Sequence, residues 1–107
     1  MQAETEHKVT NIRASLDLLR QHIGMDSAMA RLEELNAAAE DQSLWDDQEK
    51  AQSVMREKNR LDRLIGGFLQ METDLEEAIE LIAMGEEEGD ADIVKEAEAS
   101  LTALEAE

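Results

Sequence analysis

The sequence predicts an all-α fold, an elongated antiparallel bundle of about four helices with one long central helix. The 107 residues contain no proline and only two aromatic residues, Trp45 and Phe68. Alanine, leucine, glutamate and glutamine are abundant, and these residues lose little conformational freedom on entering a helix. Apolar residues recur at intervals of three and four along most of the chain. We therefore expect a single helical domain over residues 1–107.

The first half of the chain predicts two helices, near residues 5–23 and 27–39. In the first of these, the apolar residues share one face: Val9, Ile12, Leu16, Leu19 and Ile23. Gly24 has the position of a left-handed C-terminal cap. Asp26 or Ser27 is expected to cap the second helix. The stretch EDQS then interrupts the periodicity and predicts a turn.

A long third helix is predicted near residues 46–84. Its apolar residues repeat every seven residues with a second set between them, as in a coiled coil: Val54, Leu61, Phe68, Leu75 and Ile82, with Leu64, Met71 and Ala78 between them. Gly66 and Gly67 interrupt this helix, where two glycines cost about 2 kcal/mol relative to alanine. We interpret the pair as a close helix–helix approach or a bend rather than a ligand site. Gly85 is expected to end the helix.

A polar loop, GEEEGDAD, is predicted before a fourth helix near residues 91–106, which Asp90 or Asp92 would cap. The first two helices are expected to pack on the N-terminal half of the third helix, and the fourth on its C-terminal half. The fourth helix carries no stop signal before the sequence ends. We therefore expect an excised domain or a truncated chain.

The stretch LWDD, which begins at Leu44, predicts how the third helix starts. Asp46 followed by Glu49 resembles a capping box, so Asp46 is expected to accept hydrogen bonds from the first turn. Leu44 and Trp45 precede this cap, and we expect Trp45 to be buried at the turn with its indole N–H near solvent. The alternative is an exposed tryptophan that anchors a partner.

The net charge of −17, from 27 acids and 10 bases, limits the classes of partner that the chain is expected to bind. Phosphate backbones would repel most of this surface, so we expect no direct strong nucleic-acid binding and favour a protein partner. The plainer interpretation is that acidic helices keep a thin bundle soluble. One basic stripe is an exception, because Arg56, Arg60 and Arg63 fall on one helix face. It indicates either pairing with the surplus acids or a contact for ribosomal or other RNA.

The sequence predicts no catalytic residue, cofactor or metal site. His7 and His22 lie about four turns apart on the first helix, and the acids between residues 86 and 92 lack the spacing of a calcium-binding loop. The chain has no cysteine, which agrees with a reducing compartment. No apolar stretch is long enough to cross a membrane, and the N-terminus is too polar for a signal peptide. We expect a cytoplasmic binding protein that is not an enzyme.

Several short motifs carry a resemblance to a known family. They are RLEELN (Arg31 to Asn36), LWDD, EKAQ (Glu49 to Gln52), and the Met55 and Arg56 that follow. With these motifs, the stretch from Leu18 to Ile65 resembles the N-terminal domain of the bacterial peptide chain release factor 2 family. We expect the resemblance to extend over the whole chain.

The resemblance implies a role in translation termination at UAA and UGA codons on the ribosome. In the family, a Ser-Pro-Phe tripeptide reads the codon and a Gly-Gly-Gln loop promotes hydrolysis of peptidyl-tRNA. Neither motif occurs in this chain. The resemblance therefore implies contacts with the base of the ribosomal stalk and with the remaining domains of the factor. The alternative is a free-standing acidic, coiled-coil-like adaptor that binds a helix of a partner protein.

Overall fold

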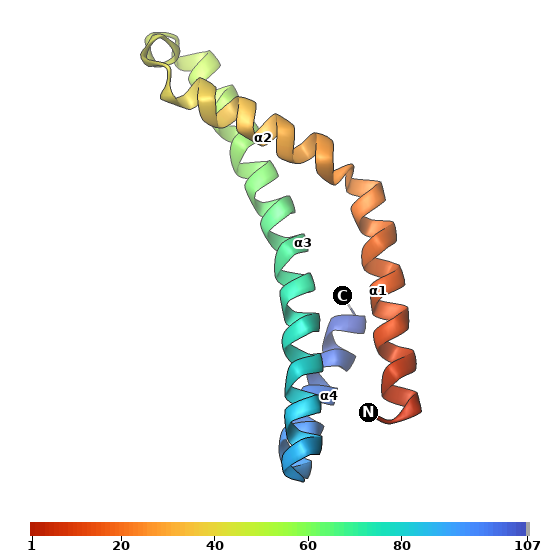
Figure 1. Ribbon diagram of the computed structural model, residues 1–107. Coiled ribbons are helices and arrows are strands. Elements are labelled where there is room, and N and C mark those ends of the chain that lie inside the picture. The colour runs from red at the N-terminus through yellow and green to blue at the C-terminus, as the bar shows by residue number, and fades with distance from the viewer. Residues whose placement is uncertain (107) are drawn as a thin grey trace. The chain divides into compact units, whose positions relative to one another are not determined.

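The computed structural model describes residues 1–106, which form four α-helices and one 3-10 helix and contain no strand (Figure 1). The elements are α1 (Ala3–Ile23), α2 (Met25–Glu40), η1 (Gln42–Asp46), α3 (Gln48–Glu88) and α4 (Ala91–Glu105). The predicted all-α class with one long helix is confirmed. The chain divides into two compact units. The hairpin unit is Arg20–Phe68, and the three-helix unit comprises Met1–Leu19 and the chain from Leu69 onward.

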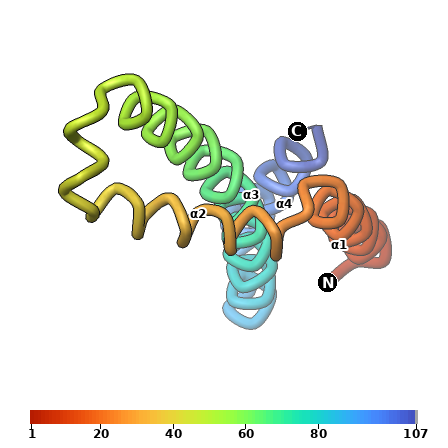
Figure 2. The backbone as a smooth tube through the Cα atoms, turned by 90° about the horizontal axis from the view of Figure 1, so that it is seen from above, coloured from red at the N-terminus to blue at the C-terminus, as the bar shows by residue number. Residues whose placement is uncertain are grey.

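In the hairpin unit, α2 and the N-terminal part of α3 lie side by side, joined through η1 (Figure 1, Figure 2). Their buried apolar side chains recur at helical spacing: Met25, Ala28 and Leu35 on α2, Leu44 in η1, and Ala51, Leu61, Ile65 and Phe68 on α3. Burial of apolar surface contributes about 25 cal/mol per Å². This apolar seam therefore stabilises the packing of the two helices.

In the three-helix unit, α1 and α4 both pack on the C-terminal part of α3. The Met1 amino group lies 2.7 Å from the Glu86 carboxylate, and Arg13 lies 2.7 Å from Glu76. The order of these pairs makes α1 antiparallel to α3. Lys8 Nζ donates to Thr102 Oγ1 at 3.0 Å, which links α1 to α4. The core of this unit contains Ile12 and Leu16 from α1, Leu75, Ala78 and Ile82 from α3, and Ala97, Leu101 and Leu104 from α4.

The position of α1 corrects one prediction. We expected α1 on the N-terminal half of α3, but its Arg13 pairs with Glu76, in the C-terminal half. Gly24 is the only residue between α1 and α2. A connection of one residue is too short for α1 to fold back beside α2 on the same half of α3, since packed antiparallel helices need loops of about 2–8 residues. The predicted packing of α2 and of α4 is confirmed by the contacts of each with α3.

The junction between α1 and α2 depends on a left-handed glycine. Gly24 has φ 66°, and its N–H donates to the Arg20 carbonyl at 3.1 Å, so the predicted C-terminal cap is confirmed. The expectation that Asp26 or Ser27 caps α2 is wrong. Because α2 begins at Met25, both residues lie inside its first turn, and Gly24 takes the capping position without a side-chain hydrogen bond.

The start of α3 also differs from the prediction. Asp46 ends the 3-10 helix, so it cannot cap α3, and Asp47 takes that role. The Lys50 N–H donates to Asp47 Oδ1 at 3.2 Å. Asp41 caps the 3-10 helix in the same manner and accepts hydrogen bonds from the N–H and hydroxyl of Ser43 at 3.0 and 2.8 Å. These hydrogen bonds lower the pKa of Asp41.

The two adjacent aspartates provide a matched test of this cap. Replacing Asp47 with alanine is expected to lower the free energy of unfolding by about 1 kcal/mol, the usual contribution of an N-cap side chain. Asp46→Ala should change it by less than about 0.5 kcal/mol, as an exposed substitution normally does. Urea unfolding followed by circular dichroism measures both values. A larger loss for Asp46→Ala would return the cap to Asp46.

The C-terminal end of α3 lies four residues beyond the prediction. Gly85 does not end the helix but is buried within it. A Cβ added at Gly85 would lie 2.8 Å from Val94 Cγ2, so the glycine lets α4 approach closely. Gly89 ends the helix instead, with φ 70° and with the Asp90 N–H bonded to the Gly85 carbonyl at 2.8 Å, the hydrogen bond of a Schellman cap. Most of the predicted loop is therefore helical, and Asp90 caps α4 as expected.

The seven-residue repeat predicts the core of α3 well. Leu61, Phe68, Leu75 and Ile82 are buried, whereas Val54, the first residue of the repeat, is only half-buried. Between them, Ala78 is buried and Met71 is half-buried, whereas Leu64 is 37% exposed. The interpretation of Gly66 and Gly67 as a close helix approach is wrong for the described residues, because a Cβ at either position would meet no atom within 4 Å. No helix among residues 1–106 is long and apolar enough to span a membrane.

Candidate functional site

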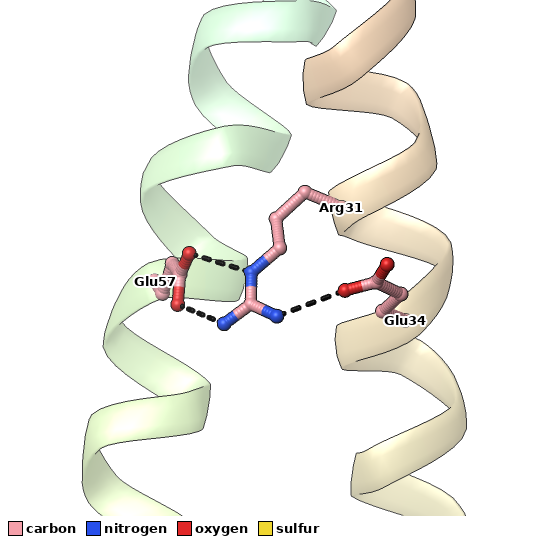
Figure 3. A network of polar contacts seen from close by, with 3 residues as sticks. All are labelled: Arg31, Glu34 and Glu57. Carbon is pink, nitrogen blue, oxygen red and sulfur yellow. Dashed lines mark hydrogen bonds and ion pairs between the residues drawn. The ribbon is translucent and has the colours of Figure 1, made fainter.

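A polar network fixes α2 against α3 in the hairpin unit (Figure 3). The Arg31 guanidinium on α2 donates from Nε and Nη2 to the two carboxylate oxygens of Glu57 on α3, both at 2.9 Å. Its Nη1 donates to Glu34, one turn along α2, at 2.9 Å. A two-pronged guanidinium–carboxylate contact restricts orientation as well as distance. The network therefore adds an orientation-dependent contact between α2 and α3 in this unit.

The charges of this network perturb each other's protonation. The hydrogen bond from Arg31 lowers the pKa of Glu57, and the positive charges of Arg31 and Arg60 add to the effect. The hydrogen bond to Glu57, followed by that to Glu34, raises the pKa of the Arg31 guanidinium. Because the pKa of Glu57 is lowered by folding, the pair stabilises the fold at neutral pH and loses that contribution as the pH falls through the lowered pKa. The groups are exposed, so solvent screening keeps the contribution small.

The three predicted contact residues lie on the solvent side of α3. Arg56, Arg60 and Arg63 are all exposed. Within residues 1–106, none of them makes an ion pair or a side-chain hydrogen bond, in contrast to Lys58, which pairs with Asp62 at 2.9 Å. The stripe therefore makes no direct ion pair with an acid in the described residues, although the charge of Arg60 acts on Glu57.

The surface around these arginines has a composition that sequence reasoning missed. At 100° per residue, the side chains of α3 between residues 52 and 67 that lie within about 60° of Arg56 include no carboxylate. We call this surface the arginine face: Gln52, Ser53, Arg56, Asn59, Arg60, Arg63 and Gly67. All of these residues are exposed. The acids of the same stretch point elsewhere, and Glu57 and Asp62 are each bonded to a base. A helical projection of residues 52–67 would have found this face.

The turn residues are placed differently from one another. Leu44 is 6% exposed and belongs to the core of the hairpin unit, whereas Trp45 is 53% exposed. The prediction that Trp45 is substantially buried is therefore wrong. Its indole Nε1–H donates to the Ala39 carbonyl at 3.1 Å, which holds the ring at the turn. Asp46 is exposed.

The other titratable residues considered from the sequence come together in no cluster. His7 and His22 are both exposed on α1. Residues 1–106 contain no group of three histidine, aspartate or glutamate side chains placed to hold a metal ion. The two surface features that the described residues do present are a basic face on α3 and an exposed aromatic residue at the η1 turn.

Comparisons with known proteins identify the family. The model of the PCRF domain matches residues 28–107. The chain is 45% identical over 104 residues to peptide chain release factor 2 of Paramagnetospirillum magneticum, 44% identical to that of Ruegeria, and 33% identical over 101 residues to that of Burkholderia cenocepacia. Each match covers at least 94% of this chain but 28% of the relative.

The region matched is the N-terminal part of these relatives. The comparisons give no support to the alternative of a free-standing adaptor. They agree with the motifs around Trp45 that carried the resemblance. The chain belongs to the PCRF domain family, and over nearly its whole length its relatives are the N-terminal parts of peptide chain release factors 2.

Proposed function

We propose that this chain acts as the N-terminal domain, residues 1–107, of a cytoplasmic factor that terminates translation at UAA and UGA codons. In this role it supplies contacts with the ribosome, at the base of the stalk, and with the remaining domains of the factor. The observation that carries the proposal is the match of 97% of the chain to 28% of release factor 2. Codon reading and peptidyl-tRNA hydrolysis are assigned to the other domains, because the Ser-Pro-Phe and Gly-Gly-Gln motifs are absent from this sequence.

The arginine face is the surface that we assign to ribosomal RNA. Its three arginines are exposed and make no ion pair within residues 1–106, so they are available to phosphate groups without breaking a contact. Gln52, Ser53 and Asn59 add neutral hydrogen-bonding groups, which commonly contact phosphate and sugar oxygens. The net charge of −17 opposes RNA binding by the isolated chain. The face therefore supports a contact that the other domains bring into place, rather than independent binding.

Charge reversal in the full-length factor tests this assignment. The triple variant R56E/R60E/R63E is expected to associate with ribosomes about tenfold more slowly, since electrostatic steering acts mainly on the association rate. The slope of log K against the logarithm of the salt concentration, where K is the association constant for the ribosome, should become less steep by about 2–3 if all three arginines displace counterions from phosphates. Stopped-flow association at several salt concentrations measures both quantities. Thermal melting of the domain should change little, because the three side chains are exposed and the interaction of the Arg60 charge with Glu57 is screened by solvent.

A matched variant separates local contact from total charge. The variant K8E/R13E/K95E reverses three bases of the three-helix unit and alters the net charge by the same amount. Because it also removes the Lys8–Thr102 hydrogen bond and the Arg13–Glu76 ion pair, the two variants are compared at a temperature where circular dichroism shows that both are folded. It is expected to slow association much less than R56E/R60E/R63E. Equal effects of the two variants would exclude the arginine face as a specific contact. Peptide release at UGA by the 107-residue chain alone would overturn the assignment of its role.

A further inference from the structure

The tryptophan at the η1 turn is held in place and yet presents its ring to solvent. The indole N–H, its only polar group, is satisfied by the Ala39 carbonyl at 3.1 Å. The residue nevertheless remains 53% exposed, so it presents apolar ring surface to solvent. An exposed aromatic ring that is already fixed loses little conformational entropy on binding. This arrangement is typical of an interface anchor.

A shallow apolar groove continues from the ring onto the first two turns of α3. Trp45, Gln48, Ala51, Gln52 and Met55 line a volume of about 370 Å³ that is open to solvent. Ala51 and Met55 contribute apolar atoms to its lining. Methionine adapts to different partner shapes because it is unbranched and polarizable. The groove is large enough to receive an apolar side chain from another molecule.

The charges around this groove select its occupant. Residues 40–50 contain five acids and one base, a local charge of 1 − 5 = −4. The acids are Glu40, Asp41, Asp46, Asp47 and Glu49, and all five are exposed. Nucleic acid and anionic lipid would be repelled here, and so would a second copy of the chain, which carries the same charge. A basic protein surface would be attracted, and its lysine or arginine side chains can stack on the indole face.

We propose that the η1 tip, formed by Trp45, the groove beside it and the five surrounding acids, is a docking site for a basic protein surface that inserts an apolar side chain. The η1 turn lies at the end of the α2–α3 hairpin (Figure 1), where a partner reaches it without displacing any element of the hairpin unit. The inference goes beyond the proposed function, because it concerns a protein partner and an acidic tip that shares only Gln52 with the arginine face. It can be tested without ribosomes.

The single tryptophan makes the site self-reporting, because Trp45 is the only residue of the chain that fluoresces when excited at 295 nm. We would titrate the 107-residue chain with two synthetic peptides of equal positive charge, one of alternating lysine and leucine and one of alternating lysine and serine. The lysine–leucine peptide is expected to shift the Trp45 emission to shorter wavelength and to bind at least tenfold more tightly. Equal binding of the two peptides, or an unchanged emission, would overturn the proposal, because charge alone would then explain the affinity.

Variants identify the contributing residues by calorimetric titration. Trp45→Ala is expected to weaken binding of the lysine–leucine peptide at least tenfold. Met55→Gln keeps the tryptophan and a good helix former, and should weaken the same peptide severalfold even if Trp45→Ala fails to fold. The variant E40Q/D46N/E49Q should weaken both peptides, while E80Q/E87Q/E88Q, an equal change of charge in the three-helix unit, should not. Undiminished binding by Met55→Gln and by a folded Trp45→Ala would exclude the groove.

Other occupants have distinct outcomes in the same fluorescence assay. An RNA oligonucleotide or vesicles of anionic lipid that shift the Trp45 emission would contradict the assignment to a basic protein. An emission shift that grows with the concentration of the chain alone would assign the tip to a second copy instead. The proposal expects no response in any of these three experiments.

Discussion

Replacing Leu101 with alanine is expected to lower the free energy of unfolding of the three-helix unit by about 2–5 kcal/mol. Leu101 lies on α4 and is 0% exposed, in a core that three helices share. The substitution removes buried methyl groups and leaves a cavity that the surrounding helices fill only partly. A loss of this size is a large fraction of the 5–15 kcal/mol that typically stabilises a domain.

Leu18 provides the matched control, since it is also a helical leucine but is 67% exposed on α1. Leu18→Ala should change the free energy of unfolding by less than about 0.5 kcal/mol. Chemical denaturation of the two variants under the same conditions measures the contrast. If both leucines prove equally tolerant of truncation, α4 does not pack on α3 in solution as the structure shows.

The core of α3 could be predicted from the sequence because a helix repeats its faces regularly. A seven-residue spacing returns side chains to nearly the same angle, and Leu61, Phe68, Leu75 and Ile82 are all buried as this spacing requires. The partner of each segment could not be predicted in the same way. Periodicity reports that a face is buried and carries no information on which helix covers it. The position of α1 was missed for this reason.

Helix ends were harder to predict because several residues of the right type compete at each boundary. Asp46 and Asp47 are equally good N-caps in isolation. Because Asp46 is the last residue of the 3-10 helix, Asp47 is the residue that precedes α3 and caps it. Gly85 and Gly89 compete in the same manner at the other end of α3. A glycine serves either a left-handed turn or a close approach, and the packing of Val94 against Gly85 leaves the turn to Gly89.

The candidate surfaces were predicted in part. The spacing of Arg56, Arg60 and Arg63 placed them on one face, and the structure leaves all three exposed. Trp45 was misjudged because burial is the default for a large aromatic residue in a small bundle. Leu44 occupies the core at this turn instead. Leu44 fills the apolar space at this turn by itself, and Trp45 therefore lies at the surface.

Replacing both Gly66 and Gly67 with alanine is expected to raise the free energy of unfolding by about 2 kcal/mol, since alanine is favoured over glycine by about 1 kcal/mol at each interior helix position. Both residues lie inside α3 with ordinary helical backbone, because the only glycines with positive φ among residues 1–106 are elsewhere. An added Cβ meets no atom within 4 Å at either position. The gain arises mainly from the reduced entropy of the unfolded chain.

The same substitution at Gly85 is the control with the opposite sign. A Cβ there would lie 2.8 Å from Val94 Cγ2 and 3.2 Å from the Asp90 carbonyl oxygen, so Gly85→Ala must displace α4 and should destabilise the fold. Urea unfolding gives the free energies of the unsubstituted chain, of G66A/G67A and of Gly85→Ala. Amide hydrogen exchange near residue 66 should be slower in G66A/G67A, because local opening of the helix becomes rarer. A loss of stability in G66A/G67A would mean that these glycines permit a bend of α3 or a close contact that a straight, solvated helix would not need.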